Sequence, residues 1–123
     1  MKTFGALIIL LFLTSSNQSL AAGQCPSPMT GEVHILVKFI PGPRWSEFSK
    51  YVSGHLAVLT SGMKAGHIIS AGPAMDDDGN LIGGYTRYSS GSKKEVEALV
   101  VKDPLIQNSV MTYETSIWLD CHL

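Results

Sequence analysis

Residues 32–39, EVHILVKF, alternate apolar and polar side chains in the pattern of a half-buried β-strand. One face of this strand carries Val33, Ile35, Val37 and Phe39, and the other carries His34, Leu36 and Lys38. The strand is expected to end at Pro41-Gly42-Pro43, because proline has no N–H to donate to a neighbouring strand.

The elements that follow complete a β-α-β-β-α-β order. Gly66 ends the first helix, Gly72-Pro73 closes the second strand, and Ser92 and Glu95 form a capping box at the start of the second helix. A short helical turn is expected after Asp103-Pro104. The predicted ranges are 46–65 and 92–102 for the helices, and 67–71, 81–88 and 111–119 for the later strands.

This order is that of the ferredoxin-like fold, an α+β class in which two helices cover one face of an antiparallel sheet. Right-handed crossovers place the first strand beside the third, with the fourth antiparallel to the first. Gly83-Gly84 in the third strand predicts a bulge or a close backbone approach.

The uncovered sheet face has a mixed character. A polar sheet face is usually only a solvent face. Leu36 and Trp118 are large apolar residues on this face and favour pairing with a second sheet, so we predict a homodimer. The remaining residues of the face are His34 and Lys38 on the first strand, and Thr112, Glu114 and Ser116 on the last.

Residues 1–22 have the layout of a secretory signal peptide. Lys2 precedes an apolar run over 4–13, and Ala21 and Ala22 both suit the cleavage site. The run is too short to span a bilayer, and a buried N-terminal helix is the alternative. We therefore predict an exported protein, periplasmic or secreted, whose domain covers residues 23–123 and needs no membrane once the signal is removed.

The charge and histidine pattern excludes several functions. Without Lys2, eight Lys and Arg face ten Asp and Glu, a net charge of −2 with no basic stripe, so nucleic acid is not an expected partner. No phosphate-binding loop occurs, and the four histidines lack a metal-ligand spacing. We expect no metal and no cofactor.

The two cysteines, Cys25 and Cys121, lie at opposite ends of the mature chain. An even count in an exported protein predicts a disulfide, and two separate thiols are the alternative. The ferredoxin-like topology brings the start of the first strand beside the end of the fourth, which supports the bond.

His55 and Asp103 are the candidates for chemistry. His55 lies on the apolar stripe of the first helix, where it is either a core residue or a base whose protonation the surroundings control. Asp103 is either a helix N-cap before Pro104 or the partner that orients an imidazole. We further predict that Ser70, Arg87 and Tyr88 line the substrate pocket.

Together these segments resemble the YCII-related family. The resemblance rests on HLAVL at 55–59, GHIISAGP at 66–73, Asp103-Pro104 and Val110, and extends over most of the mature chain. It implies a ferredoxin-like fold that dimerises into an α+β barrel, and a His/Asp pair that maps onto His55 and Asp103. This chain departs from the family pattern in its signal peptide, its disulfide, its polar third strand and the absence of an aromatic residue after Asp103-Pro104.

The resemblance also implies an activity, since one relative is a dehydrochlorinase of a chlorinated hydroxyquinol. We predict a cofactor-independent lyase or isomerase-like enzyme that uses His55 as general base and Asp103 as its partner, on a small polar organic molecule. The alternative is a non-catalytic exported dimer that binds a small ligand. A polar pocket with a proton-transfer pair favours the enzyme, and a pocket lined mainly by Leu, Met and Trp favours binding.

Overall fold

The computed structural model describes residues 24–123, so the predicted signal peptide, residues 1–22, lies outside the described residues. The elements follow the predicted β-α-β-β-α-β order, with the expected short helix before the last strand. Over the described residues, no helix combines the length and the apolar character needed to cross a membrane. The strands are β1 Thr30–Pro41, β2 Ile68–Met75, β3 Leu81–Tyr88 and β4 Met111–His122, and the helices are the 3-10 turn η1 Trp45–Glu47, α2 Phe48–Lys64, α3 Lys93–Val100 and α4 Pro104–Gln107.

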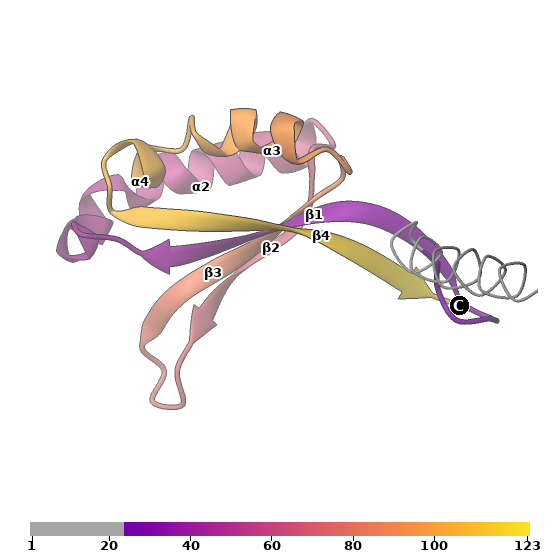
Figure 1. The fold of residues 1–123 in the computed structure, drawn as a ribbon. Helices are drawn as coiled ribbons and strands as arrows, with labels where there is room; N and C mark the ends of the chain where they lie inside the picture. Colours follow the sequence, from indigo (N-terminus) through magenta and orange to yellow (C-terminus); the bar gives the residue numbers. More distant parts are fainter. Residues whose placement is uncertain (1–23) are drawn as a thin grey trace, which may run out of the picture. The chain divides into compact units, whose positions relative to one another are not determined.

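The four strands form one sheet in the order β2-β3-β1-β4. β3 pairs antiparallel with both β1 and β2. At the end of β1, the Gly42 N–H donates to the Val110 carbonyl at 2.8 Å, next to the start of β4. Helices α2, α3 and α4 all lie on one face of the sheet (Figure 1). The predicted ferredoxin-like α+β class, with the first strand beside the third, is therefore confirmed.

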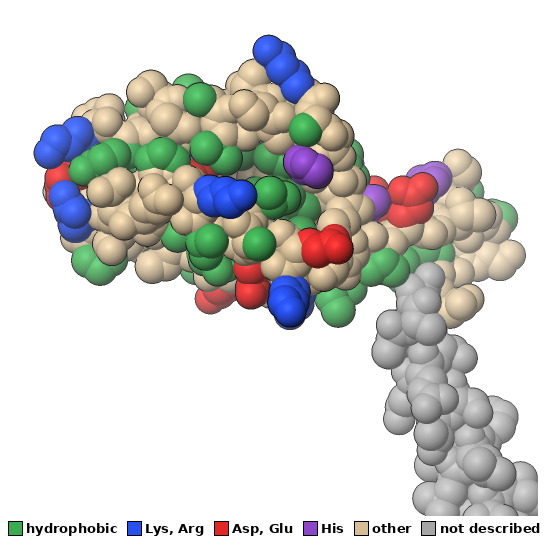
Figure 2. Space-filling model, turned by 90° about the horizontal axis from the view of Figure 1, so that it is seen from above, with side chains coloured by type: hydrophobic (Ala, Val, Ile, Leu, Met, Phe, Trp, Pro, Cys, Tyr) green, Lys and Arg blue, Asp and Glu red, His purple; other side chains and the backbone are tan. Residues whose placement is uncertain are grey.

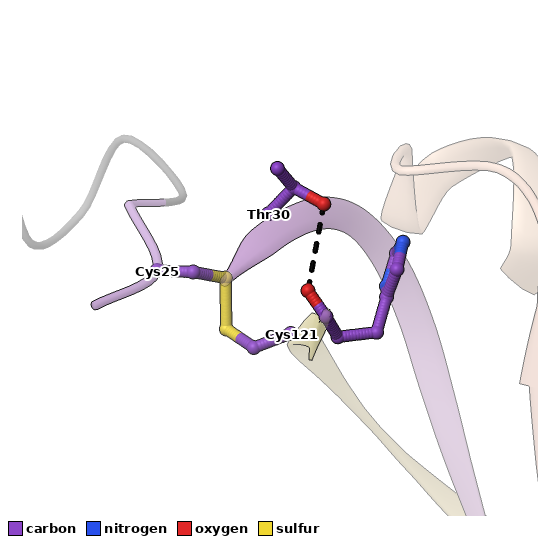
Figure 3. The surroundings of a disulfide bond; sticks show 4 residues. Cys25, Thr30 and Cys121 are labelled. Carbon is purple, nitrogen blue, oxygen red and sulfur yellow. Dashed lines mark hydrogen bonds between the residues drawn. A yellow bond between two sulfur atoms is a disulfide. The ribbon is translucent and has the colours of Figure 1, made fainter. Parts of the chain in front are cut away.

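The chain divides into two units, residues 34–118 and a smaller unit made of residues 24–33 and 119–123. Within the smaller unit, Cys25 and Cys121 form a disulfide with a Cα–Cα distance of 5.7 Å. The Thr30 hydroxyl donates to the His122 carbonyl at 3.5 Å beside it (Figure 3). The predicted disulfide is thus present in the structure.

The hydrophobic core lies in the unit of residues 34–118, between the sheet and the helices. Helix α3 buries Val96 and Val100 completely, whereas α2 contributes no fully buried side chain. Leu56 and Met63 on the apolar stripe of α2 are 54% and 43% exposed. This stripe therefore borders an open space instead of packing tightly on the sheet. The buried core residues are Ile35, Val37, Phe39, Ile68, Tyr88, Val96, Val100, Leu105, Val110 and Met111.

The prediction that Gly72-Pro73 closes the second strand is wrong, since β2 continues to Met75. β2 is an edge strand, where the missing N–H of a proline can face away from the ladder.

The predicted close backbone approach at Gly83-Gly84 in the third strand is confirmed. Gly83 has φ 145°, and a Cβ there would lie 2.3 Å from the Phe39 carbonyl oxygen, so only glycine allows this approach.

The capping of α3 is partly as predicted. The Glu95 N–H donates to the Ser92 hydroxyl oxygen at 3.3 Å. The Glu95 carboxylate, however, accepts from the Ser90 hydroxyl at 2.6 Å, and the Ser90 oxygen accepts from the Ser92 N–H. The box is thus closed through Ser90, because this hydroxyl lies between the two groups that a simple capping box would join.

Candidate active site

A hydrogen-bonded pair of His55 and Asp103 joins α2 to the start of α4. Nδ1 of His55 lies 2.5 Å from Oδ2 of Asp103, across a separation of 48 residues. The side chains are only 14% and 2% exposed, so little water competes for this contact. The carboxylate accepts from Nδ1–H, which leaves Nε2 as the nitrogen that can receive a proton.

Asp103 performs both of the roles that its sequence position allows. Its Oδ1 accepts from the Leu105 N–H at 2.9 Å and caps α4, while its Oδ2 bonds His55. The cap and Pro104 at the first helical position hold the backbone of Asp103, and hence the direction of its carboxylate. The N-cap interpretation and the dyad interpretation are therefore compatible, because each uses a different oxygen.

Gly54 allows α2 to approach α4 closely enough for this pair to form. A Cβ at Gly54 would lie 2.9 Å from Cγ of Pro104. Gly54 directly precedes His55, and Pro104 directly follows Asp103. The packing of the glycine against the proline ring thus sets the distance between His55 and Asp103.

Gly54→Ala is expected to lower the free energy of unfolding by about 1 kcal/mol. Alanine gains about 1 kcal/mol in helix propensity, but the overpacked contact with Pro104 costs about 2 kcal/mol. Urea denaturation measures the difference, and the Nδ1 proton signal of His55 in NMR should shift. Ser53→Ala, at an exposed position on the same helix, is the control. A more stable Gly54→Ala variant with an unchanged His55 signal would show that the contact between Gly54 and Pro104 does not set the distance between His55 and Asp103.

The His55 ring lines a cavity of about 380 Å³ between α2 and the sheet. The stripe of α2 forms one wall, and Phe39 stands edge-on to the imidazole with its ring centroid 5.8 Å away. Thr86, which is 2% exposed, adds a hydroxyl on the sheet side. The walls are otherwise mainly apolar, so the imidazole stands in a setting with little competing polarity. The α2 residues of the wall are Phe48, Val52, Leu56, Leu59, Thr60 and Met63.

Phe39, Gly54 and Thr86 were not identified as site residues from the sequence. Thr86 carried a usable signal, because a polar residue at an inward position of a strand is unusual. Gly54 carried a weaker one, a glycine in the middle of a helix. Phe39 had none, since an apolar residue on a core-facing strand is expected anyway.

Tyr88 lies near Asp103 but does not line the His55 cavity. It is 3% exposed, and it faces the helices from the end of β3. Burial, together with the negative charge of Asp103, raises the pKa of Tyr88 to about 12. Its hydroxyl therefore stays protonated through the neutral and mildly alkaline range.

The raised pKa of Tyr88 makes the stability of the chain pH-dependent above pH 10. An exposed tyrosine titrates at 10.0, so the unfolded chain releases this proton before the folded chain does. The contribution is constant below pH 10 and is lost as the pH rises from 10 toward 12. When the pH is raised from 9 to 11, the free energy of unfolding of Tyr88→Phe should therefore fall by about 1 kcal/mol less than that of wild type, as measured by urea denaturation. Tyr85→Phe, at a residue 44% exposed, is the control and should show the same pH dependence as wild type. If the free energy of unfolding varies with pH identically in all three proteins, the pH dependence does not come from Tyr88.

Ser70 and Arg87 lie on the opposite face of the sheet from His55 and Asp103. They line a separate hollow of about 470 Å³ together with Leu36 and Trp118. A register shift between Ile68 and Ser70 turns Ser70 outward, where it pairs with Arg87. The structure therefore does not bring all five predicted site residues into one pocket. Four residues border both hollows, namely Ala71, Gly72, Pro73 and Tyr85.

Within residues 24–123, no group of three or more His, Cys, Asp or Glu side chains is arranged to hold a metal ion. The carboxylate of Asp103 already has an acceptor role on each of its two oxygens.

The fold and the site define a class: a ferredoxin-like α+β domain with a buried His–carboxylate pair beside an apolar cavity. A model of the YCII-related domain matches residues 32–118. The chain thus belongs to the YCII-related family, which confirms the resemblance seen in its sequence.

One solved structure with a similar fold is that of a 5-chloro-2-hydroxyhydroquinone dehydrochlorinase from Burkholderia phenoliruptrix, in complex with 2,5-dihydroxybenzoquinone. It is 22% identical, with a TM-score of 0.58, and the alignment covers 71% of this chain and 93% of the other. This similarity concerns the fold. A comparison with curated proteins finds no match.

Proposed function

We propose that this protein is a cofactor-independent enzyme of the lyase or isomerase type, with His55 as general base and Asp103 as its orienting partner. The observation that carries the proposal is the hydrogen bond between Nδ1 of His55 and Oδ2 of Asp103, at the edge of a cavity that His55 lines. A base whose second nitrogen is held by a carboxylate is the common arrangement for proton abstraction.

In the proposed reaction, Nε2 of His55 takes a proton from a carbon of the substrate. The negative charge of Asp103 stabilises the imidazolium that results. The electron pair left by the C–H bond then forms a double bond and expels a leaving group with its bonding pair, which is the lyase outcome. In the isomerase outcome, the imidazolium returns the proton to a different carbon. A family relative named as a dehydrochlorinase is consistent with the first outcome.

The walls of the cavity restrict the substrate. The α2 stripe, Phe39 and Met111 are apolar, and no Lys or Arg lines this cavity. The polar groups of a substrate would meet His55 and Thr86, while its carbon skeleton packs on the apolar wall. We therefore propose a small, uncharged, cyclic molecule with a polar edge, which narrows the polar molecule expected from the sequence.

The apolar wall also favours the alternative, a dimer that binds a small ligand without converting it. The cavity has one feature that favours each function. The His55–Asp103 pair favours an enzyme, whereas walls rich in Leu, Met and Phe favour a binding protein. We rank the enzyme first, because a binding cavity needs no carboxylate behind its histidine.

The test is deuterium incorporation in D₂O, which needs no knowledge of the natural substrate. Wild-type protein is incubated with a panel of cyclic ketones and phenols, and proton NMR follows the loss of C–H signals. We expect exchange by wild type that is absent in His55→Gln and retained in His122→Gln, which removes an exposed histidine. Saturable binding of a panel member without exchange in any protein would reject the enzyme and support the binding dimer.

We further propose that residues 1–22 are a signal peptide, that residues 23–123 are the mature domain, and that the protein is exported. The disulfide supports this, because such bonds persist in oxidising compartments. Mass spectrometry of protein from the periplasm and the medium of an expressing bacterium tests the proposal. An uncleaved chain retained in the cytoplasm would contradict it.

We also propose that the open face of the sheet forms a homodimer. Leu36, Tyr85 and Trp118 line its hollow, and Trp118 is 42% exposed. Trp118→Arg is expected to convert a dimer into a monomer, because it places a charge in an apolar contact. Light scattering after gel filtration measures the mass. Ile117 points to the other side of β4, so Ile117→Arg is the control and should remain a dimer. If both variants are monomers or both are dimers, the open face is not the dimer interface.

A further inference from the structure

A second hollow lies on the other side of α2, between that helix and α3, and shares no residue with the His55 cavity. Its volume is about 400 Å³, within the range of small-molecule sites. Figure 2 views the helical face and shows hydrophobic side chains at the floor of a hollow, with basic and histidine side chains on its rim. Its floor is formed by Ala57, Val58, Ala65, Ile68 and Leu99.

The polar side chains of this hollow are all hydrogen-bond donors or cations. Ser61, His67, Tyr88 and Lys102 line it, and no Asp or Glu does. Among the ion pairs of residues 24–123, none holds Lys102 or His67. The excess of donors over acceptors favours an anionic ligand.

Tyr88 points to a ligand independently of the charge. The residue is 3% exposed and lines the hollow, yet its hydroxyl has no hydrogen-bond partner in the described chain. The Tyr88 oxygen is not one of the fully buried polar atoms, so the hydroxyl reaches the hollow and can donate to an acceptor that enters it. The raised pKa of Tyr88 keeps the hydroxyl protonated, and hence a donor, at neutral pH.

Asp103 does not compete for these donors. Its two carboxylate oxygens are held by His55 and by the Leu105 N–H, and it does not line the hollow. The Tyr88 hydroxyl can therefore donate to a ligand acceptor that enters from the open side of the hollow.

We propose that this hollow is a second binding site, which takes a small organic carboxylate with an apolar body. The carboxylate accepts from the Tyr88 hydroxyl, the Lys102 ammonium and the His67 ring. The apolar body lies on the small residues of α2, whose short side chains leave room for it. This site does not depend on the proposed activity of His55.

The test compares 4-phenylbutanoate with its uncharged analogue 4-phenylbutanamide by methyl NMR on the whole protein. We expect saturable shifts of the Ala57, Val58 and Leu99 methyl groups with the carboxylate, and at least about tenfold weaker binding of the amide. Shifts confined to Leu56, Leu59 and Met63 would place the ligand in the His55 cavity and overturn the proposal, as would equal affinity for the two probes.

Variants separate the charge from the hydroxyl. Lys102→Met keeps the apolar stem, and Tyr88→Phe keeps the ring, so both should fold. Each is expected to weaken 4-phenylbutanoate binding about tenfold. Lys102→Met should leave amide binding unchanged, whereas Tyr88→Phe should also weaken it, because the amide carbonyl accepts from the same hydroxyl. Lys64→Met removes an exposed charge at the end of α2, outside the hollow, and is the control. If Lys64→Met weakens binding as much as Lys102→Met, the affinity reflects net charge alone, and the site is rejected.

Discussion

His55→Gln is expected to slow catalysed proton exchange by about 10² to 10⁴-fold, the contribution of a well-placed general base. Glutamine fills similar space beside Phe39 but has no basic nitrogen. The readout is the initial rate of deuterium incorporation at saturating substrate. Circular dichroism and the urea midpoint must match wild type, because a folding defect would give the same loss. A residual rate near that of wild type would remove His55 from the mechanism.

Asp103→Asn is expected to reduce the same rate to a similar extent while keeping the fold. The amide oxygen can still accept from the Leu105 N–H, so the cap of α4 is retained. The amide NH₂ then faces Nδ1 of His55, which moves the ring proton to Nε2 and blocks that nitrogen as a base. Nitrogen-15 NMR of the imidazole distinguishes the two tautomers directly.

The double variant provides the sharpest discrimination. His55→Gln/Asp103→Asn should be no slower than His55→Gln alone, because residues that act as one unit are not additive. Two losses that multiply in the double variant would mean that Asp103 acts on the substrate by another route. In that case the hydrogen bond between the two residues would be structural.

Removal of the disulfide is expected to have the largest effect on stability. Cys25→Ser/Cys121→Ser should lower the free energy of unfolding by about 4 kcal/mol, because the bond closes a loop across a separation of 96 residues. Domains of this size are stable by only about 5 to 15 kcal/mol, so the loss is a large fraction of the total. The urea midpoint measures it.

Reductant supplies the matched control for the disulfide. Dithiothreitol should bring the wild-type midpoint down to that of the serine variant and should leave the variant unchanged. The exchange activity below the unfolding transition should survive, since His55 and Asp103 both lie within residues 34–118. A wild-type midpoint that reductant does not move would show that the bond contributes nothing to stability.

The order of elements and the fold class could be predicted from local patterns. Alternation in residues 32–39 identified β1, and the Gly66 stop and the Ser92 cap bounded the helices within a few residues. Each of these signals acts over a few neighbouring positions, so a single sequence contains it. The second strand was placed too short because its proline is tolerated only at a sheet edge, and edge position depends on the whole topology.

The side of the sheet to which each predicted pocket residue points could not be predicted from local patterns for Ser70, but it could be predicted for Arg87 relative to Tyr88. Alternation places Ser70 on the same face as Ile68, and only the register shift between them reverses this. Arg87 and Tyr88, in contrast, are neighbours in one strand and must point to opposite faces. Their separation between two hollows could have been predicted.

The sequence by itself determined the strand and helix order and the residue types available for proton transfer, and it predicted the disulfide that the structure contains. Only the tertiary structure decided that His55 and Asp103 meet, that His55 borders a cavity, and that Tyr88 lines the hollow between α2 and α3 and not the His55 cavity. The reason is physical: a contact across 48 residues depends on the packing of α2 against α4, which a glycine and a proline ring set through their shapes. Shape complementarity between distant segments leaves no periodic signal in the chain.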